Sequence, residues 1–309
     1  MSNKPFITYH LNTFNRLDSL KIMLESFEEC NQYANFEWVF VDLGSTDGTQ
    51  EFLFDKYKNC GYASLVLGNE NKYKDILENK GLGALNERMR FAIFGWAKNM
   101  ARSVGKGDYF IEIADDHKFI KKGDWVSDMM EVFEHRKSMN DGVCDISSII
   151  YRGMPHWRLF KPNNARGPEQ TTDSGISYFT SDIKGYDDYH MIKRSTYEEI
   201  GPYLEVDRLP RTESLEADQE KIKQWKDRAQ KPVTPDCPSA FCQYTDYIER
   251  CNKVGYQKAY LKIPYAVDTE YLKPKTPDIY FKDDELEIQF KDLDRPVSTE
   301  EINAYQFQK

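Results

Sequence analysis

The feature that most constrains the fold is a regular alternation of short apolar runs with longer amphipathic stretches in the first half of the chain. The apolar runs, among them FEWVFVD at 36–42 and DYFIEIA at 108–114, have the length and composition of buried strands. Helical spacing of apolar residues follows them or precedes them, as at Leu17, Leu20 and Leu24. This order predicts an α/β fold built from βαβ units, with a mainly parallel sheet that binds ligands at the carboxyl ends of its strands.

Composition excludes several classes of protein. With 309 residues, 40% hydrophobic and 30% charged, the chain is long enough for a large core and is globular. A net charge of -9 disfavours nucleic acid as a partner. No apolar run approaches the length of a transmembrane segment, and the start of the chain does not resemble a signal peptide. The six cysteines form no CxxC pair, so we expect reduced thiols and a cytoplasmic location.

Two carboxylates and an imidazole, Asp115, Asp116 and His117, directly follow the strand at 108–114. Adjacent desolvated carboxylates repel each other unless a cation lies between them. Oxygen ligands suit Mg²⁺ or Mn²⁺, and an added imidazole favours Mn²⁺. The competing interpretation is that both aspartates cap the next helix while His117 faces solvent.

A second carboxylate, Asp42, ends the strand at 36–42 and begins the turn VDLGSTDGT at 41–49. Its position suits a contact with a sugar hydroxyl or a base N–H, and Gly44 and Gly48 permit close backbone approach. The competing interpretation is an ordinary turn and helix cap. No Walker loop and no GxGxxG motif follows the first strand, so a kinase or dinucleotide-binding site is unsupported.

Four blocks in order resemble the nucleotide-sugar half of family 2 glycosyltransferases with the GT-A fold. They are ITYHLNTFNRLDSLKIMLESF, EWVFVDLGSTDGTQEFL, NKGLGALNERMRFAIFGWA and GDYFIEIADDHKFIKKGDW. The resemblance implies a GT-A Rossmann-like, mainly parallel central sheet flanked by helices. It implies a nucleotide-sugar-binding half at 1–125, an acceptor-binding and catalytic half of the same domain at 126–275, and a C-terminal extension at 276–309.

The resemblance also assigns residues to the donor and the metal. Asp42 would bind the nucleobase, usually uracil, and the metal, Mn²⁺ or Mg²⁺, would be held by Asp116, Asp115 and His117. The remaining donor-binding residues implied are Tyr9, Leu11, Asn12, Arg16, Lys80, Asn86 and Asp115. The helix carries Leu85 where many family members have arginine, which leaves a cation missing near the diphosphate.

The second half of the family pattern is fainter. Asp246, in YTDYIERCNKVGY, matches the catalytic base that takes a proton from the acceptor hydroxyl. The competing interpretation is a carboxylate favoured at a helix N-terminus. Candidate acceptor residues, of which the last three are also rival bases, are Trp157, Asp187, Asp188 and His190.

The sequence therefore predicts a metal-dependent, inverting glycosyltransferase that moves a sugar from a UDP-sugar to an acceptor hydroxyl. The acceptor would be a surface glycan, a lipid-linked glycan or another hydroxyl, with a modified DNA base the least favoured because the chain is acidic. Two alternatives stay open: a sugar-phosphate nucleotidyltransferase, and a non-catalytic protein that binds nucleotide sugars. The first usually carries a glycine-rich basic loop after the first strand, which HLNTFNR lacks.

Overall fold

A computed structural model gives the structure of the chain. It describes residues 4–68, 87–119, 121–138, 143–151, 166–181, 189–203, 247 and 250–268. In this part of the chain, no helix combines the length and the apolar composition needed to cross a bilayer.

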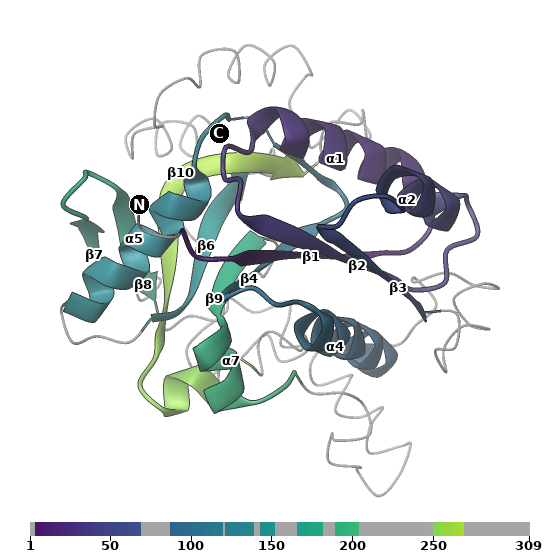
Figure 1. Cartoon of the computed structure of the whole chain (residues 1–309). Coiled ribbons are helices and arrows are strands. Elements are labelled where there is room, and N and C mark those ends of the chain that lie inside the picture. Colours follow the sequence, from purple (N-terminus) through teal and green to yellow (C-terminus); the bar gives the residue numbers. More distant parts are fainter. Residues whose placement is uncertain are drawn as a thin grey trace, which may run out of the picture.

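The sheet begins with the four strands that the sequence predicts. They are β1 (Ile7–Thr13), β2 (Phe36–Asp42), β3 (Ala63–Leu67) and β4 (Tyr109–Ala114), in the spatial order β3-β2-β1-β4. All three pairings are parallel. Figure 1 shows these strands crossing the centre of the molecule. The expected α/β fold with a mainly parallel central sheet is therefore confirmed for this half of the sheet.

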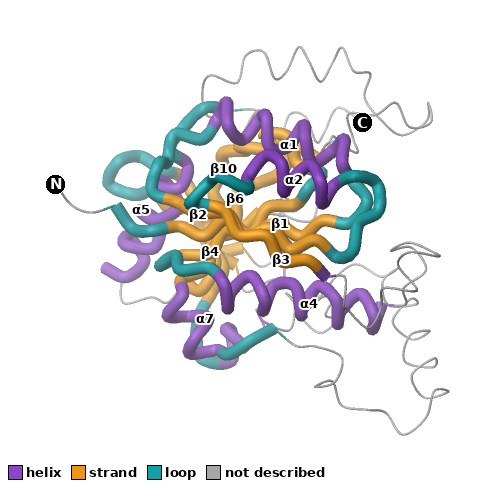
Figure 2. The backbone as a smooth tube through the Cα atoms, turned by 45° about the vertical axis from the view of Figure 1, so that its right-hand side comes forward, coloured by secondary structure: helices purple, strands orange, loops and turns teal. Residues whose placement is uncertain are grey.

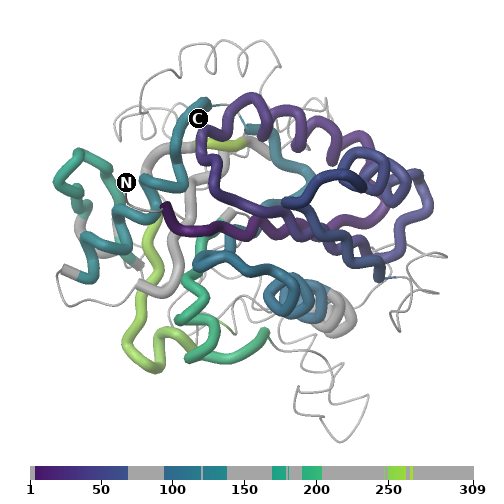
Figure 3. Tube along the Cα trace, viewed as in Figure 1, coloured from purple at the N-terminus to yellow at the C-terminus, as the bar shows by residue number. Residues whose placement is uncertain are grey.

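Beyond β4 the same sheet becomes mixed, in the order β4-β9-β6-β10-β8-β7. Strand β9 is antiparallel to both β4 and β6, whereas β6 and β10 are parallel. In Figure 3 the first three strands are purple to blue, whereas β9 is green and the coloured part of β10 is yellow-green. The strands of this half are β5 (His117–Phe119), β6 (Val143–Tyr151), β7 (Arg166–Thr171), β8 (Ser177–Ser181), β9 (Tyr189–Lys193) and β10 (Gln257–Asp268).

Helices cover both faces of the sheet, as Figure 2 shows. On one face lie α1 (Leu17–Cys30) and α2 (Thr49–Tyr57), with α5 (Trp125–Ser138) against the second half of the sheet. On the opposite face lie α4 (Glu87–Val104) and α7 (Arg194–Ile200). Because both faces are covered, most residues of the inner strands β1 and β2 are buried.

The α1 face holds an aromatic core. Tyr9 of β1 packs edge-on against Phe27 of α1 with ring centroids 4.8 Å apart, and it lies 5.1 Å from Trp38 and 5.7 Å from Trp125. All four rings are at most 2% exposed. Side chains alternate along a strand, so the neighbours of Tyr9 in β1 face α4 instead.

The α4 face differs because it buries charged groups among its apolar residues. Lys98 of α4 is 1% exposed, and its Nζ lies 2.5 Å from Oε1 of Glu112 on β4. His10 of β1 and His190 of β9, both fully buried, approach Oε2 of the same glutamate at 3.9 and 3.8 Å. We call Lys98, Glu112, His10 and His190 the buried charge cluster.

Candidate functional site

Three strands end at one level and bring their last residues to the same edge of the sheet. In the parallel register Thr13 lies beside Asp42, and Asn12 lies beside Ala114, the residue before Asp115. The carboxyl ends of adjacent parallel strands form the ligand-binding edge of open α/β sheets. The first strand thus separates the two carboxylates that the sequence singles out.

Asp42 is fully buried, and its two carboxylate oxygens have different surroundings. Oδ1 accepts hydrogen bonds from the backbone N–H groups of Gly44 at 2.9 Å and Ser45 at 2.8 Å, and from the side-chain amide of Gln50 at 2.6 Å. Oδ2 is buried and has no hydrogen-bond partner among the described residues. The turn interpretation of Asp42 accounts for Oδ1 only. A buried acceptor without a donor is costly, so Oδ2 is suited to a ligand N–H or O–H.

Asp115 and Asp116 form a tight turn between β4 and β5. The Arg16 guanidinium reaches both of them, with Nη1 at 2.6 Å from Oδ2 of Asp116 and 3.7 Å from Oδ1 of Asp115. Burial raises the pKa of Asp115 to about 7, Arg16 opposes this rise, and the neighbouring Asp116 adds to it. These two carboxylates therefore depend on a nearby cation to remain ionised together.

The capping interpretation of these aspartates is wrong, and so is the exposed position for His117. Helix α5 begins at Trp125, and it is Asp124 whose Oδ1 accepts the backbone N–H of Ser127 at 3.2 Å. His117 is 1% exposed and lies in β5, a short strand that the sequence did not predict. That strand pairs with the end of β10, where the register sets Asp268 opposite His117.

Hydrogen bonds join the loop after β1 to the loop after β2 next to Arg16, and the sequence did not predict these bonds. Asn15 adopts a left-handed backbone conformation with φ 51°. Its backbone N–H donates to Oγ of Ser45 at 2.9 Å, and its Oδ1 accepts from the N–H of Thr46 at 2.7 Å. Asp47 also accepts from the N–H of Leu17 at 3.0 Å. The signal was an Asn in a turn, a residue that tolerates positive φ.

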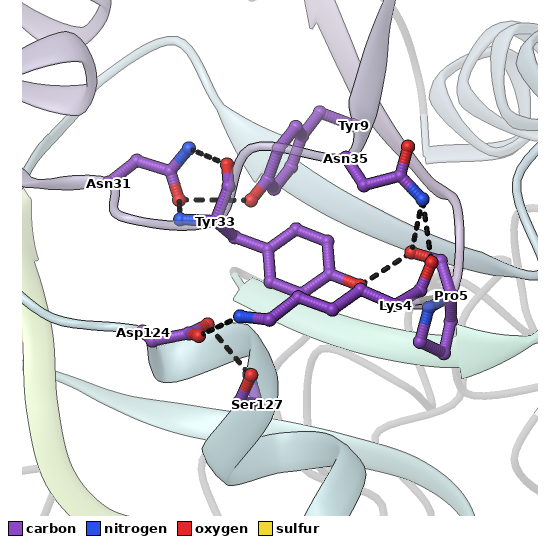
Figure 4. A network of polar contacts seen from close by, with 8 residues as sticks. All are labelled: Lys4, Pro5, Tyr9, Asn31, Tyr33, Asn35, Asp124 and Ser127. Carbon is purple, nitrogen blue, oxygen red and sulfur yellow. Dashed lines mark hydrogen bonds and ion pairs between the residues drawn. The ribbon is translucent and has the colours of Figure 1, made fainter. Parts of the chain in front are cut away.

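Four residues that the resemblance placed at the donor or acceptor have other surroundings. Tyr9 and Leu11 have no exposed surface and lie in the core of the α1 face, and the Tyr9 hydroxyl donates to Oδ1 of Asn31 at 3.3 Å (Figure 4). His190 belongs to the buried charge cluster. Asn12 is half-buried at the edge, and its Oδ1 lies 2.6 Å from Nε2 of His10.

Figure 4 shows a polar network around the start of β1. The Tyr33 hydroxyl donates to the carbonyl of Pro5, and the Asn35 amide donates to the same carbonyl at 3.1 Å. Lys4 pairs with Asp124 at 2.7 Å. These bonds fasten the start of β1 to the segment after α1 and to the start of α5. The Tyr9 ring lies next to this network and contacts Trp125 in the core.

The other predicted site residues lie outside the described residues. They are Lys80, Asn86, Trp157, Asp187, Asp188 and Asp246.

The aspartate turn fits a hard divalent cation. It offers carboxylate oxygens, the donors that Mg²⁺ and Mn²⁺ prefer, and a guanidinium already lies against both carboxylates. Within the described ranges, no group of three or more His, Cys, Asp or Glu side chains is arranged to hold a metal. A cation held by two carboxylates alone would keep coordination positions for a ligand such as a diphosphate.

Comparisons with known proteins give the following likenesses. No protein-family profile matches the chain, and no curated protein matches its sequence. Mannosyltransferase PcManGT from Pyrobaculum calidifontis, in complex with GDP-Man and Mn²⁺, matches 66% of this chain with 17% identity and a TM-score of 0.42. S. aureus TarS 1–349 matches 90% with 14% identity and a TM-score of 0.48, and its complex with UDP matches 84% with 15% identity and a TM-score of 0.48.

The chain spans 48% of the length of the first of these proteins, and 67% and 59% of the two TarS structures. The identities are 17% or lower and the TM-scores are below 0.5. These likenesses therefore do not establish a donor, an acceptor or a metal for this chain.

Proposed function

We propose that the chain is a metal-dependent, inverting glycosyltransferase of family 2 that transfers a sugar from a UDP-sugar to an acceptor hydroxyl. The observation that carries the proposal is Oδ2 of Asp42, a fully buried carboxylate oxygen without a partner among the described residues. It lies at the same sheet edge as the Asp115–Asp116 turn, with β1 between them. A base acceptor and a pair of carboxylates at one edge suit a nucleoside diphosphate.

The chemistry of Asp42 favours particular bases. A carboxylate oxygen accepts but does not donate, so it requires a base that presents an N–H. Uracil presents the N–H of its imide and guanine also presents a ring N–H, whereas the ring N3 of cytosine is an acceptor and only its amino group could donate to the carboxylate. Hydrogen bonds from Gly44, Ser45 and Gln50 fix the orientation of Oδ1 and thereby aim Oδ2. The site is thus preorganised to discriminate between bases.

The aspartate turn would hold the metal through Asp115 and Asp116. A bound Mn²⁺ or Mg²⁺ would supply positive charge to the departing diphosphate. Arg16 supplies a second cation at this corner, in a chain whose sequence has Leu85 where many family members have arginine. Burial of Asp115 strengthens every electrostatic interaction at this corner.

Asp246 is the proposed base, and this role rests on the sequence alone. Its carboxylate would take the proton of the acceptor hydroxyl as that oxygen attacks the anomeric carbon opposite UDP. The acceptor is proposed to be a glycan, a lipid-linked glycan or another hydroxyl compound. A cytoplasmic location is likewise proposed from the sequence alone. Replacing Asp246 with asparagine should abolish transfer while leaving UDP affinity unchanged.

The proposal is tested by UDP binding and by hydrolysis of UDP-, GDP- and CMP-sugars with Mn²⁺ or with EDTA. We expect UDP-sugars to be preferred and EDTA to remove activity. Asp42→Asn should weaken UDP binding by about tenfold or more, since it removes a hydrogen bond to a charged group. Asp55→Asn, at an exposed aspartate paired only with the surface residue Lys58 in the described contacts, is the matched control. Equal UDP affinity in both variants would refute the assignment of Asp42.

The alternative of a nucleotidyltransferase is separated by its products. That reaction would release pyrophosphate from a nucleoside triphosphate and a sugar phosphate. Pyrophosphate release without any turnover of nucleotide sugars would replace the present proposal. UDP binding without turnover of either kind would indicate a binding protein instead.

A further inference from the structure

The guanidinium of Arg16 occupies the position where a metal would be expected. Its Nη1 lies 2.6 Å from Oδ2 of Asp116 and 3.7 Å from Oδ1 of Asp115. The Arg16 side chain is 34% exposed, whereas those of Asp115 and Asp116 are 10% and 20% exposed. The cation is therefore more exposed to solvent than the two carboxylates that it contacts.

The backbone keeps Arg16 in this position. Arg16 directly precedes α1, and the bonds from Asn15 to Ser45 and Thr46 fix the preceding turn. The N–H of Leu17 is held by Asp47. Arg16 is thus attached to the rigid loops of β1 and β2, while the carboxylates belong to the turn after β4. Only its side chain needs to rotate for the guanidinium to leave.

We propose that Arg16 is a built-in cation that holds the Asp115–Asp116 turn together before a divalent ion binds, and that the nucleotide diphosphate draws it away. This inference rests on the proposed function, because it requires that the turn be the metal site. A guanidinium and a divalent ion cannot share these two carboxylates without strong repulsion. The diphosphate offers Arg16 a bidentate partner of the kind that guanidinium groups prefer.

The consequence is positive coupling between nucleotide and metal. Metal alone must displace Arg16 and so binds weakly, whereas metal with nucleotide finds the guanidinium already engaged by phosphate. Coupling between two ligands is reciprocal, so the metal must raise nucleotide affinity by the same factor. Removing the guanidinium should tighten binding of metal alone and reduce this factor.

The experiment measures Mn²⁺ binding from the free-ion signal in electron paramagnetic resonance, on the full chain, with and without UDP. Without UDP, Arg16→Gln should bind Mn²⁺ about tenfold tighter than the wild type, the order expected for removing a unit charge beside a divalent ion. Arg16→Lys, which keeps the charge, should stay close to the wild type. UDP should increase Mn²⁺ affinity by a smaller factor in Arg16→Gln than in the wild type.

The matched control is Lys58→Gln, which removes the same charge from an exposed pair with Asp55 at 2.8 Å. It should leave Mn²⁺ affinity unchanged. Equal Mn²⁺ affinity of wild type and Arg16→Gln would overturn the role of Arg16 and leave the metal site intact, provided Asp116→Asn abolishes binding. Mn²⁺ binding that survives Asp116→Asn, or that no form of the protein displays, would overturn the metal site and this inference together.

Discussion

Replacing Glu112 with alanine is expected to destabilise the protein by about 3–5 kcal/mol, because it removes the carboxylate from a buried ion pair. Lys98 is 1% exposed, and its ammonium lies 2.5 Å from Oε1 of Glu112. The stem of Lys98 comes from α4, and its Nζ also lies 5.2 Å from the centre of the Tyr203 ring. In this enclosed position water cannot replace the lost carboxylate.

A double-variant cycle gives the magnitude of the pair itself. Lys98→Met should cost a similar amount, because it takes the ammonium group away from the largely buried Glu112 carboxylate. The double variant Lys98→Met with Glu112→Ala should be far less destabilised than the sum of the two single changes, with a coupling of about 3 kcal/mol. A loss of about 4 kcal/mol corresponds to a fall in Tm of ~6 °C in a chain of this length.

The measurement is thermal and urea unfolding followed by circular dichroism. The control cycle uses Lys58 and Asp55, whose exposed side chains are 2.8 Å apart and should couple by less than about 0.5 kcal/mol. Additive effects of the Lys98 and Glu112 changes, or a coupling no larger than that of the control pair, would refute the account of the α4 face.

Three further predictions concern stability. Burial, assisted by Arg102, lowers the pKa of His10 well below its ordinary value, so protonation of His10 favours the unfolded state. As the pH decreases below about 6.5, the free energy of unfolding should decrease by up to ~1.4 kcal/mol per pH unit. His10→Gln should make this pH dependence weaker in urea titrations. An unchanged pH dependence in His10→Gln would contradict the assignment of this effect to His10. Gly107→Ala should destabilise the protein by about 2 kcal/mol or more, since a Cβ there would lie 2.3 Å from the backbone nitrogen of Thr8. In the control Gly61→Ala, the added Cβ meets nothing within 4 Å and stability should be unchanged. Equal Tm values of the two variants would contradict this prediction. Asn15→Ala should cost about 1–2 kcal/mol in urea unfolding, through positive φ and a lost hydrogen bond, and no loss would be the contrary result.

The parallel half of the fold was predictable because its signals are local. The runs at 36–42 and 108–114 are rich in apolar residues, and each is next to a stretch with helical spacing. Both become inner strands, β2 and β4. The position of Asp42 and Asp115 at one edge follows from strand direction alone, which is why the sequence was sufficient to predict it.

The features that the sequence did not predict depend on contacts between residues that are far apart in the chain. Strand β5 exists only because His117–Phe119 pairs with Ala266–Asp268, far along the chain. Glu112 interrupts an apolar run, and nothing in its neighbourhood in sequence shows that Lys98 will lie against it. The position of Arg16 over Asp116 requires the turn at Asn15, which no periodicity reveals.

Alternation of side chains along β1 explains why some residues that the family resemblance assigned to the donor site lie in the core instead. Tyr9 and Leu11 occupy positions of β1 that face α1, and there they fill the core. Asn12 lies on the other face, at the edge, in contact with His10. For this reason we leave Tyr9 and Leu11 out of the proposed donor site and retain Asn12.

The most direct test of the central claim is a crystal structure with UDP and Mn²⁺, with anomalous scattering recorded at the manganese edge. We expect one anomalous peak within bonding distance of the Asp115 or Asp116 carboxylate, and the uracil imide N–H about 3 Å from Oδ2 of Asp42. A manganese peak away from this turn, or a base bound with Oδ2 of Asp42 still lacking a donor, would contradict the account.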